Sequence, residues 1–271
     1  MVSPPRSGWR SCLRSTTVKT VSGRQAKAAR PGAKVSSMEE HAGRIITTAE
    51  RMLALELADI PLARDSQFII GWMRAAYDQS RVIAKLTSDG LAHAAAPNRR
   101  AFSEIAFRLL WLRSLDRGQR APALDTMIAN EKRLTTGFYD TLKEMGYEHE
   151  IDLSEMEKVV ADVIDDKELR QQVKAVTDAA KAAPITLGLY SAWREETQYT
   201  HATAHLAVAY APEEPANRLG RGEPPLQHAD LDLHHMVCLR IATLTVELLK
   251  DAGVDPDVVW PIMSTAWNVE Q

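Results

Sequence analysis

The segment WREETQYTHATAH, residues 193–205, contains the side chains best suited to acid–base chemistry. If it forms one helix, Arg194, Gln198, His201 and His205 follow one another at helical spacing and share one polar face. A guanidinium on that face could hold a phosphate oxyanion while an imidazole moves a proton. We therefore predict Arg194 and His201 as catalytic residues, with Gln198 and His205 as binding residues beside them.

An ordinary solvated or hydrogen-bonded helix face would show the same residue types. The chain has 22 Arg and 8 His, and the Arg-to-His spacing of this segment occurs a second time, from Arg221 to His228. Glu195 and Glu196, next to the arginine, would repel a nucleic-acid backbone. Spacing alone therefore leaves this structural interpretation open.

A metal site is a third interpretation of the same segment. His201 and His205 are four residues apart, which is the geometry of helical zinc pairs. The third ligand would have to come from another helix, with His93, Glu104, His234 and His235 as candidates. Ala202 and Thr203 follow His201, so the acid of a zinc-protease motif is missing. We assign no metal and no cofactor.

A second group of charged residues lies in RRAFSEIAFRLLWL, residues 99–112, where Arg100, Glu104 and Arg108 interrupt an apolar helix. Glu104 and Arg108 have the spacing and order of an exposed ion pair within one helix. Alternatively, Glu104 is partly buried and orients Arg194 or His201 from a neighbouring helix, because a buried charge needs a partner. We include Glu104 among the predicted catalytic residues.

The spacing from Arg194 to His201 resembles the motif of the HEPN ribonucleases. This helical superfamily cleaves RNA without a metal and uses such a pair across a dimer. The resemblance implies RNA as the substrate and a homodimer as the active species.

The Arg-x-x-x-Glu helix and the later Tyr-x-His together resemble a bacterial all-helical family, domain of unknown function 5677. In that family a helix like RRAFSEIAFRLLWL precedes a segment like YSAWREETQYTHAT. The resemblance covers about residues 65–210 and implies Arg100, Glu104, Tyr199 and His201 as site residues. It supplies a site but no reaction.

The elements that position these residues are helices, because no stretch alternates with period two over the length of a strand. We predict an all-α fold, a single bundle of about seven to nine helices spanning residues 38–271. The predicted helices cover about residues 38–58, 65–90, 98–115, 123–145, 186–210 and 229–252, with a short one around Trp260. Residues 148–183 are predicted to form an exposed acidic helical hairpin, and the Pro- and Gly-rich residues 211–228 a mobile loop.

Charge divides the chain unevenly. Residues 1–37 hold eight Lys or Arg and no acid, which leaves 25 basic against 36 acidic residues, a net charge of −11, for the rest. The basic segment has no apolar periodicity and is predicted to be disordered. It resembles an organellar transit peptide in composition, but we favour a true start at Met38, which mass spectrometry of the native protein would test.

The remaining composition bounds the protein class. Cys12 and Cys238 stand in unrelated contexts and no long uncharged apolar run occurs, so we predict a cytoplasmic protein without a membrane span. Two main functions follow: a metal-independent RNA-cleaving enzyme, or a non-catalytic interaction or sensor module that binds a protein or small ligand. A histidine-based metal-binding bundle is the third.

Overall fold

The computed structural model describes residues 31–147, 154, 164–183, 187–215, 218–222 and 230–268, with only the backbone at 31–37 and 187. The elements are α1 (Pro31–Leu53), α2 (Arg64–Ser88), η1 (Ala92–Ala95), α3 (Ala96–Ser114), α4 (Arg117–Glu144), α6 (Lys167–Lys174), α7 (Val176–Ala182), α8 (Leu187–Thr200), α9 (Ala204–Tyr210), β1 (Glu213–Glu214), β2 (Arg218–Leu219), α10 (Leu231–Asp251) and α11 (Pro256–Ala266). The all-α prediction is confirmed. The described residues alone form ten α-helices, slightly more than the seven to nine expected.

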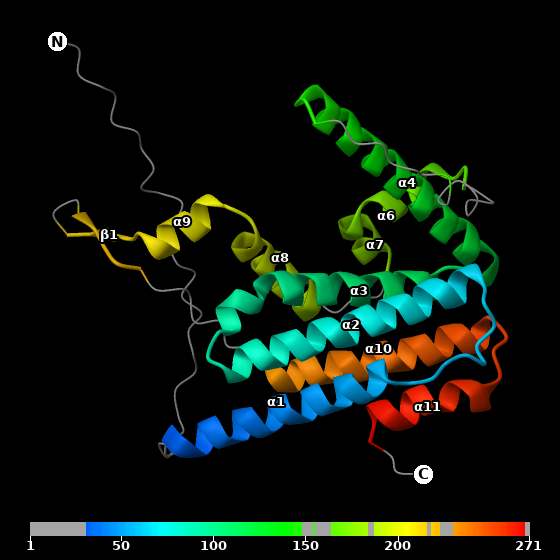
Figure 1. Cartoon of the computed structure of the whole chain (residues 1–271), viewed down its shortest axis with the longest axis horizontal. Coiled ribbons are helices and arrows are strands. Elements are labelled where there is room, and N and C mark those ends of the chain that lie inside the picture. The colour runs from blue at the N-terminus through cyan, green and yellow to red at the C-terminus, as the bar shows by residue number, and fades with distance from the viewer. Residues whose placement is uncertain are drawn as a thin grey trace.

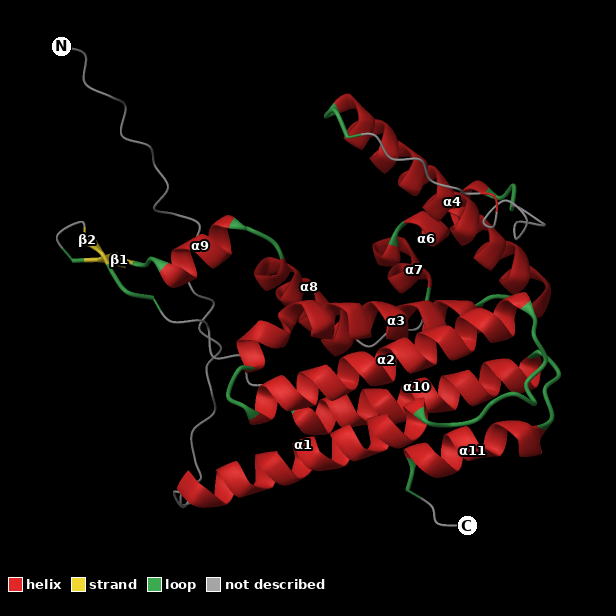
Figure 2. Ribbon diagram, viewed as in Figure 1, coloured by secondary structure: helices red, strands yellow, loops and turns green. Residues whose placement is uncertain are grey.

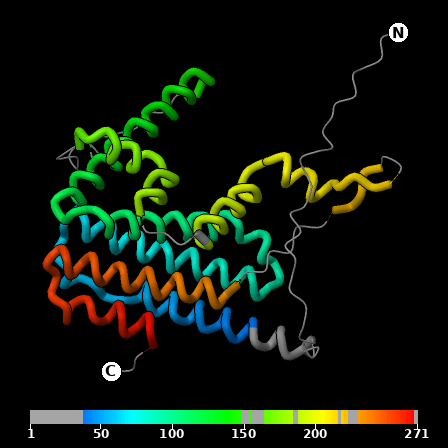
Figure 3. Tube along the Cα trace, turned by 180° about the vertical axis from the view of Figure 1, so that it is seen from behind, coloured from blue at the N-terminus to red at the C-terminus, as the bar shows by residue number. Residues whose placement is uncertain are grey.

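Five long elements form the body of the molecule. Helices α1, α2, α3 and α10 run side by side, and α11 packs against α1 and α10 (Figure 1). Helix α4 leaves this bundle obliquely, with α6 and α7 between it and α3. Helices α8 and α9 and the short β1–β2 hairpin extend from the other end, which is also visible from behind (Figure 3). Of the predicted site residues, Arg100 and Glu104 lie on α3 and Arg194 lies on α8, and these two helices are in contact.

The core follows the periodicity of the sequence. On α2 an apolar stripe at helical spacing is buried, at Ile69, Met73, Ala76 and Ile83. Helix α10 buries its second half in the main core but exposes apolar side chains near its start. Burying large aliphatic side chains supplies the main stabilisation, about 1.5–3 kcal/mol for each.

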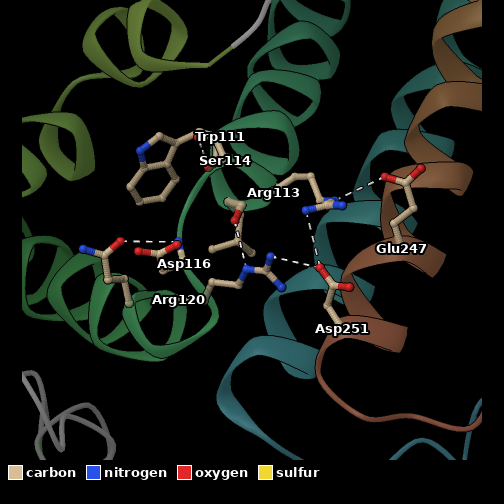
Figure 4. A network of polar contacts seen from close by, with 9 residues as sticks. Trp111, Arg113, Ser114, Asp116, Arg120, Glu247 and Asp251 are labelled. Atoms are coloured by element: carbon tan, nitrogen blue, oxygen red, sulfur yellow. Dashed lines mark hydrogen bonds and ion pairs between the residues drawn. The ribbon is translucent and has the colours of Figure 1, made fainter.

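A network of charged groups holds the turn between α3 and α4 against the end of α10 (Figure 4). The Arg120 guanidinium is 3% exposed, donates to the Leu112 carbonyl at 3.1 Å and contacts Asp251 at 3.2 Å. Arg113 reaches Asp251 at 3.5 Å and Glu247 at 3.4 Å. The ion pairs of Arg113 and Arg120 with Glu247 and Asp251 join residues more than 130 positions apart, so they hold distant parts of the chain together.

Several predicted boundaries differ from the structure. Helix α1 begins at Pro31, ahead of the start expected at Met38, and the predicted disordered tail lies outside the described residues up to residue 30. The fourth helix begins at Arg117, ahead of the start expected at residue 123, and Pro122 lies inside it.

The predicted acidic hairpin and mobile loop fall partly outside the described residues. Most of 148–163 is not described, whereas Leu169 and Val173 of α6 are buried against the core, so this part is not an exposed hairpin. Within 211–222 the chain forms the two-residue strands β1 and β2, the yellow segments of Figure 2. None of the described helices has the length and apolar character needed to cross a membrane.

Candidate functional site

Helix α8 packs across α3, and this contact creates the site. On α3, Asn98 is tied to α2 because its Nδ2 donates to Gln79 Oε1 at 2.7 Å. Further along, the Phe107 ring meets the Trp193 ring of α8 edge-on, with centroids 5.9 Å apart. Trp193 is 4% exposed, so it is the apolar contact that seats α8.

Four side chains form one chain of polar contacts, which we call the Arg100 cluster: Arg100, Glu104, Trp193 and His201. Glu104 Oε1 accepts from Arg100 Nε at 2.9 Å and from Trp193 Nε1 at 3.0 Å. Arg100 Nη1 lies 2.7 Å from His201 Nε2. Arginine can only donate, so this contact requires a neutral His201 ring with its proton on Nδ1.

The Arg100 guanidinium is oriented by three groups. Besides the two hydrogen-bond partners, the Trp193 ring lies beneath it, with 5.5 Å between the guanidinium carbon and the ring centroid. The Arg100 and Glu104 side chains are 25% and 30% exposed, and His201 is exposed. A ligand can therefore approach the Arg100–His201 contact from solvent.

A second ion pair joins the same helices one residue earlier. Arg99 binds Glu196 through two contacts of 2.6 and 3.0 Å, and both side chains are 13% exposed. Burial, the largest effect, raises the pKa of Glu196, while the Arg99 charge opposes that rise. Such a bidentate pair fixes the register of α8 on α3.

The predicted polar stripe does not lie on one helix. Helix α8 ends at Thr200, and His201 is in the turn that follows. Thr203 starts α9: its hydroxyl accepts from the Leu206 amide at 3.2 Å and donates to the Gln198 carbonyl at 2.7 Å. The expectation of a continuous helix to Tyr210 is wrong, because a threonine cap opens a new helix there.

The other predicted site residues form no hydrogen bond with the described side chains of the cluster. Arg194 is exposed, and its guanidinium carbon is 6.0 Å from the Trp193 ring centroid. Tyr199 and His205 contact each other instead, with 3.1 Å between Oη and Nε2. Gln198 is exposed. Arg194 and His201, the expected pair, therefore share no contact, and Arg100 takes the expected place of Arg194.

Glu104 also has a different partner from the one that its spacing suggested. Its ion pair is with Arg100, four residues earlier. Arg108 is buried and donates to the carbonyls of Gln172 and Val173 at the end of α6, at 2.8 and 2.9 Å. Burial lowers the pKa of Arg108 to about 10, and Glu104 and Glu131 oppose this shift. Arg108 is therefore a structural residue between α3 and α6.

A buried polar group that the sequence did not reveal lies behind α3. Ser80 Oγ contacts His234 Nε2 at 2.8 Å and Cys238 Sγ at 3.2 Å, and the Phe102 ring covers the imidazole at a centroid distance of 4.4 Å. Burial, with Arg99 and His235 adding to it, lowers the pKa of His234 to about 3. His234 also lines a cavity of about 160 Å³ beside Arg99. The sequence feature that could have indicated this buried contact is Ser80, a polar residue within the apolar stripe of α2.

The described residues hold no group of three or more His, Cys, Asp or Glu side chains that could bind a metal ion. His201 and His205 are in different elements, and His234 is buried against Ser80 and Phe102. The metal interpretation has no support in this geometry.

Comparison with known proteins gives no further assignment. No family profile, curated protein sequence or solved structure matches the chain.

Proposed function

We propose that the protein cleaves RNA without a metal, using the Arg100 cluster as its site. The observation that carries the proposal is the 2.7 Å contact between Arg100 Nη1 and His201 Nε2. It pairs an oxyanion-binding group with a group that can accept a proton, on an exposed surface. The residue types and their spacing alone favoured Arg194 for this role, whereas the contact favours Arg100.

The chemistry requires the substrate to enter between these two groups. A phosphate oxygen takes the Arg100 N–H groups, which frees the Nε2 lone pair of His201. His201 then accepts the proton of the ribose 2′-hydroxyl, whose oxygen attacks the phosphorus. The bond to the 5′-oxygen breaks, and this oxygen takes a proton from water. The products are a 2′,3′-cyclic phosphate and a 5′-hydroxyl end.

Glu104 and Trp193 are positioning residues in this proposal. Glu104 binds Arg100 and is itself held by the indole N–H of Trp193. Three of the four residues that the resemblance to domain of unknown function 5677 nominates, Arg100, Glu104 and His201, thus occur in one cluster, which supports the proposed site. Family membership and the likeness to the HEPN ribonucleases remain proposals.

Charge sets the expected mode of substrate binding. Arg99 and Arg100 are each paired with a carboxylate, and the chain beyond residue 37 has a net charge of −11. If only Arg100 and Arg194 contact the phosphates of single-stranded RNA, the logarithm of the binding constant should fall with the logarithm of the salt concentration at a slope of about −1.4. We therefore expect weak binding that depends little on salt.

Incubating the protein with a structured RNA and a single-stranded RNA in EDTA tests the proposal. Wild type should cleave and leave cyclic phosphate ends, while His201→Ala should lower the rate by about 10²-fold or more, the contribution of a proton-transfer group. The matched control is His205→Ala, another exposed histidine nearby, which should retain activity. Equal rates in wild type and His201→Ala would exclude the proposed role.

A non-catalytic binding module is the second candidate function, and one observation favours it. A groove of about 410 Å³ between α3, α8 and α10 is lined mainly by apolar side chains, and Leu233 and Met236 on its edge are 53% and 59% exposed. If no RNA is cleaved, an apolar fluorescent probe should bind wild type and fail to bind Met236→Arg.

A further inference from the structure

A second polar cavity lies away from the Arg100 cluster, between α1, the start of α10 and the turn after α11. Its volume is about 220 Å³. Its polar wall consists of His41 and Arg44 from α1, Asp232 and His235 from α10, and Asn268. Ile45 and Leu231 supply the apolar part of the wall. The cavity shares no residue with the site described above.

Basic groups outnumber acidic groups around this cavity. Among the described residues that line it, Asp232 is the one carboxylate; it is 78% exposed and contacts His41 Nδ1 at 3.3 Å. Neither Arg44 nor the His235 ring forms a hydrogen bond or ion pair with any residue that the structure describes. Arg44 is exposed and His235 is half-buried, so both cationic groups are accessible to a ligand that enters the cavity.

The basic groups also act on one another. The pKa of His235 is lowered first by burial, then by the charge of Arg44 and by His41, while Asp232 opposes the shift. Arg51, further along α1, helps to hold Asn268 in the wall of the cavity, because its Nη1 donates to Asn268 Oδ1 at 3.4 Å. Protonating His235 therefore costs free energy in the free protein, and a bound anion would reduce that cost.

We propose that this cavity binds the phosphate group of a small phosphomonoester. Arg44 would hold the phosphate oxygens as a fixed cation, and His41 and His235 would add donors when they are protonated. The apolar wall suits a small organic group attached to the phosphate. A nucleic-acid backbone fits less well, because the space is limited to about 220 Å³. This inference does not depend on RNA cleavage by the Arg100 cluster.

Sulfate is the first probe, because it stays a dianion from pH 5 to pH 8 and any pH dependence then belongs to the protein. The full chain is titrated with sodium sulfate at pH 6.0 and pH 8.0, at ionic strength matched with sodium chloride, and binding is followed by calorimetry and by Tm. We expect the affinity to be about three- to fivefold higher at pH 6.0, because one histidine pKa raised by about one unit on binding would give a full tenfold change only if the whole titration lay between the two pH values. Phenyl phosphate should bind more tightly than sulfate at either pH, because it also contacts the apolar wall.

Two variants and one control connect the binding to this cavity. Arg44→Gln should abolish the sulfate response, and His235→Asn should remove most of its pH dependence. Arg81→Gln removes a cation that pairs with Asp78 on the surface of α2, and its response should equal that of wild type. If either cavity variant fails to fold, His41→Asn replaces it. Equal sulfate binding in wild type and Arg44→Gln, or no binding above the chloride control, would overturn the proposal.

Discussion

Replacing His234 with Gln should remove much of the acid sensitivity of the fold. The His234 imidazole has a pKa of about 3 in the folded protein against 6.5 for an ordinary histidine. Between these values the unfolded chain binds a proton that the folded protein does not. The free energy of unfolding therefore falls as the pH drops below 6.5, by about 1.4 kcal/mol per pH unit.

The magnitude follows from the two pKa values. At pH 5 the wild type should have lost about 2 kcal/mol of stability through this group, while at pH 7.5 the loss is close to zero. The cause is the burial of the ring under Phe102 and against Ser80. A glutamine at position 234 keeps a polar contact to Ser80 but cannot take up a proton. Between pH 7.5 and pH 5, the free energy of unfolding of His234→Gln should therefore rise by about 2 kcal/mol relative to that of wild type.

Urea denaturation followed by circular dichroism at pH 7.5, 6.0 and 5.0 measures this shift. His205→Gln serves as the matched control, because it removes an exposed histidine that lies outside the buried group. Parallel stability curves for wild type and His234→Gln between pH 7.5 and pH 5.0 would refute the assignment of a buried neutral imidazole.

Three further predictions concern stability, and all are measured by urea denaturation at pH 7.5: two remove an ion pair between helices and one changes a glycine. Glu196→Gln should cost about 2 kcal/mol, because the bidentate pair with α3 is only 13% exposed and its guanidinium loses a charged partner. Asp251→Asn should cost about 1 kcal/mol, a value reduced by the 41% exposure of Asp251, since the buried Arg120 keeps its carbonyl partner. Gly253→Ala should cost about 1–2 kcal/mol because its φ is +94°, whereas Gly71→Ala, inside α2 with open space around its Cβ, should not destabilise the fold. A stability loss for Gly71→Ala equal to that of Gly253→Ala would contradict the backbone argument.

The helical class and most element positions followed from local sequence signals. The apolar stripe of residues 65–90 predicted α2, and Gly90, with a φ of +75°, stands just beyond its end. Asp230 caps α10 by accepting from the Leu233 amide at 2.9 Å, close to the predicted start at residue 229. These signals act within one or two helical turns, so they can be recognised without knowing the fold.

Three of the four residues of the Arg100 cluster (Arg100, Glu104 and His201) were nominated from the sequence and Trp193 was not, and the pairing of the four was not predictable. Arg194 and His201 have a spacing that recurs by composition, and Thr203 ends the shared helix face between His201 and His205. Threonine is a preferred N-cap, so Thr203 could have indicated the start of a new helix. The regular spacing of the polar residues favoured one continuous helix instead.

By itself the sequence determined the helices, their apolar faces and the short list of polar residues that could do chemistry. Only the tertiary structure decided that Glu104 pairs with Arg100, because Trp193 arrives from α8 to share its carboxylate and Arg108 is drawn to the carbonyls of α6. It likewise placed Arg100 against His201, 101 positions away. Periodicity records which side of a helix faces inward, whereas the partner of each polar side chain depends on which other helix packs against that side.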